Sequence, residues 1–195
     1  MKNPKIKIVL LPGGKMPKRQ SSEAAGYDVS LRAIVSASEM DKTNPVLRKT
    51  LFDFASYPND PDIARHVHQL NGEMVYRMDP GESVLAGIGF LTALPFPMFY
   101  WVAPRSGLAS KWGITVTNAP GTVDADYRGE AGVLVFNRNA KPFDLRRDMR
   151  IAQIIFQQAI IPDMVLVSTG DELGLTDRSA GGFGSTGLGG SFSKT

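Results

Sequence analysis

Between two apolar stretches, 113–117 and 131–136, the sequence reads Asn118-Ala-Pro-Gly-Thr-Val-Asp-Ala-Asp-Tyr-Arg-Gly-Glu130. Short apolar stretches that are bounded by turn residues are typical of β-strands. The Pro120-Gly121 step between them favours a tight turn that folds the chain back on itself. This part of the chain therefore predicts a β-hairpin with a polar and charged connection.

Other parts of the chain show a short alternation of apolar and polar residues. It occurs at 5–10, 132–136 and 151–156, and clusters of glycine and proline separate these stretches. Short strands at close spacing are typical of an all-β sandwich or barrel. We therefore expect an all-β fold.

Residues 83–104 contain no charged side chain and are long enough for a helix that spans a membrane. Pro95 and Pro97 stand within this segment, and a proline inside a helix costs about 3 kcal/mol. The β-branched and aromatic content of each half instead predicts two buried strands, near 84–91 and 98–103.

The segment from about 37 to 78 is more polar and holds both histidines. Asp60 is suited to cap a short helix over 61–70, because proline at 61 fits the first helical position. His66 and His68 would lie on this helix. Two histidines without a third ligand favour a surface helix over a metal site.

The composition limits the class of protein. At 195 residues the chain suits one domain, and its 22 basic and 19 acidic residues give a net charge of +3. This charge is too small to predict nucleic-acid binding, but it suits an anionic ligand. The absence of cysteine excludes disulfides and thiolate metal sites. Because the N-terminus lacks the long apolar core of a signal peptide, we expect a cytoplasmic protein.

Five short motifs occur in one order along the chain, and they resemble the five motifs of the trimeric deoxyuridine triphosphatases, the dUTPases. The segment 118–130 resembles the third motif of that family. The other four motifs read Ala25-Gly-Tyr-Asp28, Pro104-Arg-Ser-Gly-Leu-Ala-Ser-Lys-Trp-Gly-Ile114, Arg150-Ile-Ala-Gln153 and Arg178-Ser-Ala-Gly-Gly-Phe-Gly-Ser-Thr-Gly187. Any one motif can arise by chance, but five in order very rarely do. The chain is therefore identified as a member of this family.

The resemblance implies a single jelly-roll-like β-barrel over 1–195, with one short helix after the second motif. It also implies a homotrimer whose subunits share their active sites, and a flexible glycine-rich C-terminal arm at about 170–195. The first two motifs are separated by several dozen more residues than in the family pattern. We therefore expect a partly helical insertion at about 37–78, with no partner identified for it.

The reaction implied by the resemblance is the hydrolysis of dUTP to dUMP and pyrophosphate, with Mg²⁺ as cofactor. Asp124 would orient and deprotonate the attacking water, and Asp28 would hold the hydrated Mg²⁺ through water. Asn118 would bind the uracil edge, and Tyr127 would pack on the deoxyribose. The other substrate-binding residues implied by the motifs are Arg105, Ser106, Gly107, Gly121, Thr122, Val123, Gln153, Arg178, Phe183 and Gly184.

Within the arm, Arg178 would reach the γ-phosphate and Phe183 would cover the uracil. Glycines such as Gly184 allow backbone amides to approach phosphate oxygens closely. Ser179 stands where the family usually has glycine. If that position requires a positive φ, serine costs about 1–2 kcal/mol there.

Several alternatives stay open at the level of sequence. Asp124 could stabilise a turn, Gln153 could satisfy buried backbone groups, and Tyr127 could be a core aromatic. The chain could also be a dCTP deaminase of the same fold, which ammonia release from dCTP would reveal. A third possibility is a dUTPase scaffold in which the segment 37–78 binds a regulatory protein.

Overall fold

The structure is a computed structural model, and it describes residues 3–181. The chain divides into a first unit, Met1–Ile160, and a second unit, Ile161–Thr195. The strands are β1 (Lys7–Leu10), β2 (Tyr27–Ser30), β3 (Ala33–Met40), β4 (Arg48–Phe52), β5 (Val67–Leu70), β6 (Glu73–Met78), β7 (Ser83–Gly87), β8 (Phe90–Ala93), β9 (Met98–Ala103), β10 (Ile114–Val116), β11 (Gly121–Val123), β12 (Gly132–Asn137), β13 (Phe143–Arg146) and β14 (Arg150–Gln158). The helices are α1 (Pro61–Ala64), α2 (Ser106–Trp112) and the 3-10 helix η1 (Gly170–Leu173).

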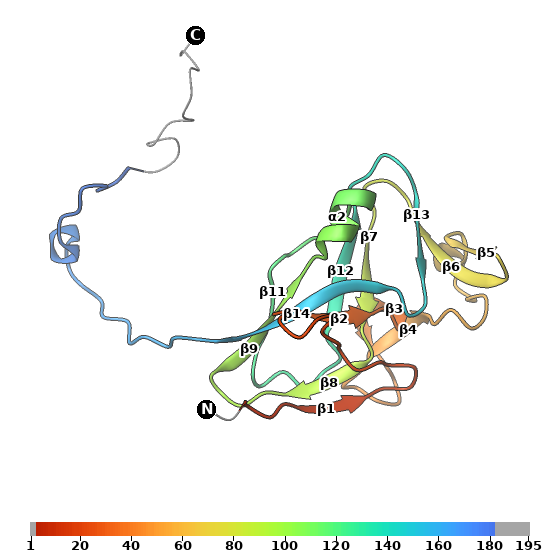
Figure 1. Ribbon diagram of the computed structural model, residues 1–195, viewed down its shortest axis with the longest axis horizontal. Coiled ribbons are helices and arrows are strands. Elements are labelled where there is room, and N and C mark those ends of the chain that lie inside the picture. The colour runs from red at the N-terminus through yellow and green to blue at the C-terminus, as the bar shows by residue number, and fades with distance from the viewer. Residues whose placement is uncertain (1–2, 182–195) are drawn as a thin grey trace, which may run out of the picture. The chain divides into compact units, whose positions relative to one another are not determined.

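The strands of the first unit form four antiparallel sheets (Figure 1). A five-stranded sheet has the order β10-β12-β7-β3-β4, and a four-stranded sheet has the order β11-β9-β14-β2. Two smaller sheets, β1-β8 and β13-β6-β5, complete the unit. The predicted all-β fold with few helices is thus confirmed. Among residues 3–181, every helix is too short or too polar to cross a membrane.

The core contains buried residues from the two larger sheets and also from the smaller ones, such as Phe90 of β8 and Met78 of β6. Along β12, Val133, Val135 and Asn137 are buried, while Leu134 and Phe136, which alternate with them, are half-buried. This alternation follows from the strand period of two. Helix α2 contributes one buried residue, Leu108, which fixes the helix against the core at the end of β9.

The predicted pairing of 113–117 with 131–136 is confirmed, but the turn within it is not. Strands β10 and β12 pair antiparallel, with Ile114 opposite Asn137. Gly121 does not close a tight turn, because it begins β11, which pairs with β9 of the other large sheet. The connection between β10 and β12 therefore reaches from one sheet to the other.

The two strands predicted for 84–91 and 98–103 are three in the structure. β7 ends at Gly87 and β8 begins at Phe90, while β9 matches the second predicted strand. Gly89 separates β7 from β8 with a φ of 78°. A Cβ at Gly89 would lie 2.5 Å from the Cα of Gly14, so only glycine allows the two backbones to cross here.

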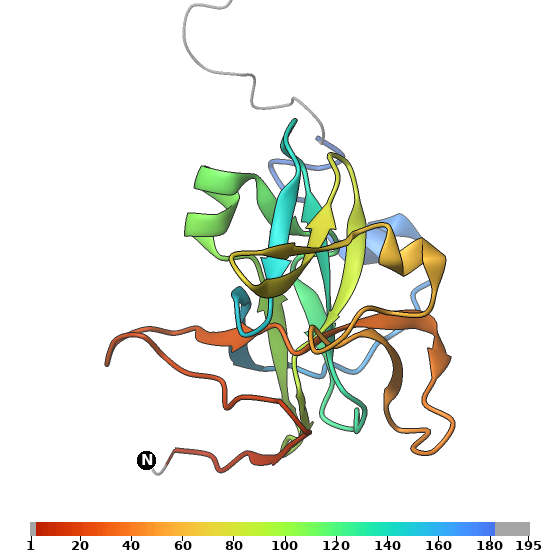
Figure 2. The ribbon, with the colours of Figure 1, turned by 90° about the vertical axis from the view of Figure 1, so that its right-hand side faces the viewer.

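The helix predicted for 61–70 is mostly wrong. Asp60 does cap α1 and accepts a hydrogen bond from the Asp62 amide at 2.9 Å, but the helix ends at Ala64. The residues that follow form the β5–β6 hairpin, which faces the viewer in Figure 2. Asn71 and Gly72 close this hairpin with φ values of 53° and 82°. An Asn-Gly pair with two positive φ angles matches the twist of a hairpin, and this strand-pairing signal outweighs the helix cap.

The segment 37–78 folds as part of the sheets of the first unit. It contains the end of β3, all of β4, α1 and β5, and β6, which pairs with β13. That this segment is an insertion remains a prediction. So does the mobility of the arm at 170–195, of which the structure describes η1 and the chain as far as residue 181.

Candidate phosphate-binding site and the residues around it

A cavity of about 230 Å³ collects residues from three of the five motifs. The strand register explains why, because Gln153 of β14 lies opposite both Asp28 of β2 and Ala103 of β9. The chain after Ala103 then continues into α2. The residues that line the cavity are Gln20, Ala24, Gly26, Asp28, Arg105, Ser106, Gly107 and Gln153. Five of these were predicted as site residues from the sequence.

Asp28 orients two arginines beside the cavity. Its Oδ1 accepts from Nε of Arg105 and its Oδ2 accepts from a guanidinium nitrogen of Arg150, each at 3.0 Å. The Asp28 side chain is only 12% exposed, so these ion pairs are partly shielded from water. Two guanidinium groups around one carboxylate leave a net positive charge, which suits an anionic ligand. Arg150 was not among the predicted site residues, although it begins the fourth motif.

Ser106 and Gly107 form the first turn of α2. The first backbone amides of a helix have no intrahelical partner, and no side chain caps them at the start of α2. Ser106 and Gly107 are also exposed. Free amides and a serine hydroxyl beside two arginines are the groups that bind phosphate oxygens in proteins.

Gln153 connects two walls of the cavity. Its side-chain amide nitrogen donates a hydrogen bond to the Pro104 carbonyl at 3.0 Å. One alternative from the sequence was that Gln153 satisfies a backbone group, and its amide nitrogen does so here. The amide oxygen of Gln153 lies over Gly26, and a Cβ at that position would collide with it. Gly26 thus leaves the space that the Gln153 side chain needs.

We expect Gly26→Ala to raise the KM for the nucleotide substrate by roughly tenfold, about the value of one hydrogen bond to a charged group. The added methyl group would displace the Gln153 amide from the cavity. Steady-state kinetics on Gly26→Ala, Gln153→Ala and the double variant test this cause. The double variant should lose no more than Gln153→Ala alone, and additive losses would show that Gly26 acts in another way.

The other predicted site residues form a second group on the β10–β12 connection. Asn118, Thr122, Asp124 and Tyr127 are exposed, and Val123 is half-buried. Gly121 is buried beneath Asn118, whose side-chain nitrogen lies 3.1 Å from the position of a Cβ there. No residue of this second group lines the 230 Å³ cavity. The structure thus brings the predicted residues together in two groups and not in one pocket.

Tyr127 and Asp124 of the second group differ in whether the side chain has a hydrogen-bond partner among the described residues. The Tyr127 hydroxyl donates a hydrogen bond to the Glu130 carbonyl at 3.0 Å. The Asp124 carboxylate has no hydrogen bond or ion pair with another residue of the described part of the chain; only its backbone carbonyl is engaged, by the Tyr127 amide. Asp124 is therefore free to interact with a water or a ligand.

Glu130 ends this connection and was not predicted as a functional residue. Its side chain is almost fully buried and forms two hydrogen bonds with the Arg32 guanidinium, at 2.8 and 2.7 Å. It also accepts a hydrogen bond from the Gly89 amide at 2.8 Å. Arg32 is 98 residues away in the sequence, so no local pattern could indicate the pair.

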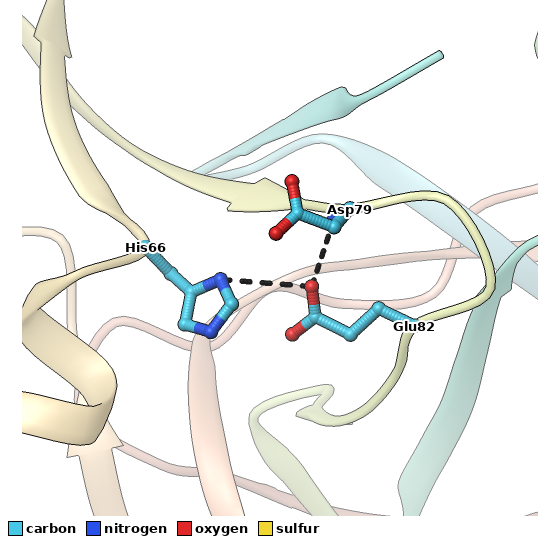
Figure 3. Close-up of side chains that lie close together, drawn as sticks. All are labelled: His66, Asp79 and Glu82. Carbon is cyan, nitrogen blue, oxygen red and sulfur yellow. Dashed lines mark hydrogen bonds and ion pairs between the residues drawn. The ribbon is translucent and has the colours of Figure 1, made fainter. Parts of the chain in front are cut away.

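His66 lies near two carboxylates in a group that resembles a metal site (Figure 3). Its Nδ1 lies 3.6 Å from the Glu82 carboxylate. Nε2 accepts a hydrogen bond from Nε of Arg65 at 3.1 Å, so the proton of the neutral ring is on Nδ1. That proton is donated to the Arg77 carbonyl at 3.0 Å. Both ring nitrogens are therefore already engaged.

The Glu82 carboxylate is engaged in the same way. One oxygen accepts from the Asp79 amide at 2.7 Å, and the other accepts from the Tyr76 hydroxyl at 2.9 Å. Burial and the nearby Glu82 carboxylate raise the pKa of Tyr76, so its hydroxyl stays protonated as a donor. These contacts close the turn between β6 and β7. They also bring His66 next to Asp79 and Glu82, two carboxylates that were not considered with the histidines at the level of sequence.

The predicted arm residues belong to the second unit. Arg178 donates a hydrogen bond through Nε to the Gly181 carbonyl at 2.7 Å. Ser179 has a φ of 44°, which is the left-handed region that favours glycine. Ser179 therefore has the positive φ at which a serine, unlike a glycine, strains the backbone. Phe183 and Gly184 lie outside the described residues.

The fold and the first cavity define an all-β protein in which residues of three separate motifs line one cavity. A family model described as dUTPase matches residues 74–187, more than half of the chain, and the chain belongs to the dUTPase family.

Individual relatives agree with this assignment. The deoxyuridine 5'-triphosphate nucleotidohydrolase of Corynebacterium jeikeium is 38% identical over 164 residues, which cover 84% of this chain and 96% of that protein. The protein of the same name from Methylocella silvestris is 52% identical over 110 residues, covering 56% of this chain and 67% of its own. The structure of the Staphylococcus bacteriophage 80alpha dUTPase with dUPNHPP has a TM-score of 0.66 at 17% identity. The match covers 95% of this chain and 100% of that one, so the two proteins share a fold.

Proposed function

We propose that the protein is a dUTP diphosphatase, which hydrolyses dUTP to dUMP and pyrophosphate. One observation carries this proposal: the cavity joins Asp28, Arg105, Ser106, Gly107 and Gln153 from three separate motifs into one positively charged site. The names of the two relatives support the same activity. A triphosphate is the anionic ligand that best uses arginines, a serine hydroxyl and free amides together.

In this proposal the two groups of residues bind different parts of the nucleotide. Arg105, Ser106, Gly107 and Gln153 bind the phosphates. Asn118, with the backbone of 121–123 (Gly121, Thr122 and Val123), reads the uracil edge. Tyr127 packs on the deoxyribose and leaves no space for a 2′-hydroxyl. Because buried polar groups are left unpaired by a wrong base, such a site discriminates strongly against cytosine.

The separation of the two groups favours an active site that is shared between subunits. The first group lines a cavity that the second group does not reach within one chain. In a homotrimer, the β10–β12 connection of one subunit would complete the cavity of its neighbour. We propose this arrangement, with the arm bringing Arg178, Phe183 and Gly184 over the nucleotide. Closure of the arm would exclude bulk water from the reacting phosphates.

Asp124 supplies the general base in the proposed reaction. Its carboxylate orients a water molecule and accepts a proton from it, while the water oxygen forms a bond to the α-phosphorus. The bond from the α-phosphorus to the bridging oxygen breaks, and pyrophosphate leaves with the electron pair. The arginines around the cavity neutralise the charge that develops on the phosphate oxygens.

The chemistry of the cavity fits Mg²⁺ held through water. Magnesium keeps several waters and uses few protein carboxylates, and among residues 3–181 Asp28 is the one carboxylate that lines the cavity. A carboxylate has about four acceptor positions, and two of those on Asp28 are used by arginines. Asp28 can therefore still accept hydrogen bonds from metal-bound water. When bound, the ion would neutralise charge on the triphosphate.

Pyrophosphate release with Mg²⁺ tests the activity, with dUTP, dCTP, dTTP and UTP compared in parallel. We expect turnover of dUTP alone. Ammonia release from dCTP would identify a deaminase instead. Binding without turnover of any nucleotide by folded protein would favour the scaffold function, in which the segment 37–78 binds a regulatory protein.

Ser179→Gly is expected to lower the KM for dUTP, by up to roughly fivefold. Glycine removes the cost of about 1 kcal/mol that a side chain pays at a φ of 44°. Ser179→Ala serves as the matched control, since it loses the hydroxyl but keeps the Cβ. If alanine lowers the KM as much as glycine does, the hydroxyl and not the backbone conformation is responsible.

A further inference from the structure

A buried ion pair holds the end of the segment that carries Asp124 and Tyr127. The Glu130 side chain is 1% exposed and the Arg32 side chain is 13% exposed. Two parallel hydrogen bonds join the carboxylate to the guanidinium, and a third comes from the Gly89 amide. The segment after β11 is therefore fastened to the β2–β3 corner and to the β7–β8 corner at one point.

The backbone of this same residue holds Tyr127. The Tyr127 hydroxyl donates to the Glu130 carbonyl at 3.0 Å. Gly129 leaves room for this contact, because a Cβ there would lie 2.6 Å from the hydroxyl oxygen. A displacement of the Glu130 backbone would thus be transmitted directly to the tyrosine ring.

An ion pair is a costly way to achieve stability alone. Taking two charges out of water costs several kcal/mol per ion, and apolar residues of similar volume often stabilise a core as well or better. A carboxylate with three fixed donors does offer something that an apolar side chain lacks, which is one defined position and orientation.

We infer that Glu130 is a positioning residue for substrate selection. Its carboxylate fixes the carbonyl that orients Tyr127, and the oriented ring excludes the 2′-hydroxyl of ribonucleotides. This inference rests on the proposed function, since it assigns the ring to the sugar of dUTP.

The test compares the ratio of kcat/KM for dUTP to kcat/KM for UTP in the wild type and in Glu130→Gln. Glutamine keeps the shape and one acceptor oxygen but breaks the paired hydrogen bonds to Arg32. We expect the ratio to fall by roughly tenfold, within the range of coupling between residues in contact. A residue that only stabilises the fold would lower the fraction of active enzyme, which affects both substrates equally and leaves the ratio unchanged.

Tyr127→Phe tests whether the effect passes through the tyrosine hydroxyl. This variant should lower the ratio by a similar factor, and Glu130→Gln in the Tyr127→Phe background should add little. Asn137→Ala is the matched control, because Asn137 is equally buried at the far end of β12 and does not contact Tyr127. It should lose stability while keeping the ratio.

If Glu130→Gln does not fold, the same ratio of kcat/KM values is measured on Arg32→Lys. Lysine keeps the positive charge and a donor but loses the paired hydrogen bonds to Glu130, so the ratio should fall here as well. An unchanged ratio in the folded variants would overturn the inference, as would a fully additive loss with Tyr127→Phe. Failure of the wild type to hydrolyse dUTP would instead refute the proposed function. The two failures are therefore distinguishable.

Discussion

Asp124→Asn is expected to lower kcat for dUTP by roughly 10²- to 10⁴-fold while KM stays close to the wild-type value. Asparagine has nearly the same shape, but it cannot accept a proton from water, and general base catalysis typically contributes a factor of this size. The Asp124 side chain is exposed, and its carboxylate has no partner among the described residues, so the substitution should not disturb the fold. Single-turnover kinetics and equilibrium binding of a non-hydrolysable dUTP analogue separate the two effects.

Asp126→Asn provides the matched control, because Asp126 is also exposed in the same connection and loses the same charge. Its loss of activity should be small by comparison. The Arg128 guanidinium nearby donates to the carbonyls of Ala125 and Tyr127. If Asp126→Asn abolishes turnover and Asp124→Asn does not, the general base has been assigned to the wrong carboxylate.

Glu130→Ala is expected to lower the free energy of unfolding by about 3–5 kcal/mol. The substitution leaves the mostly buried Arg32 guanidinium without its counter-ion, and breaking a buried pair from one side costs this much. It also leaves the Gly89 amide without its acceptor. Urea unfolding followed by circular dichroism measures the change at a fixed protein concentration, because assembly would contribute to the apparent stability.

The control for this prediction is Glu73→Ala. Glu73 lies 3.8 Å from Arg146 at the surface, and its side chain is 68% exposed. Exposed pairs contribute little, so this variant should stay within about 1 kcal/mol of the wild type. If Glu130→Ala and Glu73→Ala lower the free energy of unfolding equally, burial of the Glu130–Arg32 pair does not make its loss more costly.

Much of the fold could be predicted from local pattern. β12 and β14 lie where the alternation of apolar and polar residues predicts them, and Asp60 caps α1 as its position before proline indicates. Such features depend on residues that are neighbours in the chain. The same local reasoning failed at 61–70, where a helix cap and a hairpin turn compete within a few residues and the pairing of β5 with β6 prevails.

In the candidate site, too, some features follow from residues that are neighbours in the chain and others from the pairing of distant segments. The sequence by itself determined which residues are candidates for the chemistry: the arginine, serine and glycine of 105–107, the carboxylates Asp28 and Asp124, and Tyr127. It did so because each motif is short and contiguous. Only the tertiary structure decided which of these residues meet.

The physical reason is that strand register and buried pairing are properties of distant segments. Gln153 lies opposite Asp28 because β14 pairs with β2 in one register, and a shift of one residue would turn the side chain to the opposite face. Arg150 joins the site through the same carboxylate, across 122 residues of sequence. Glu130 finds its partner Arg32 only because the folded chain places two charged groups together where neither could remain buried alone.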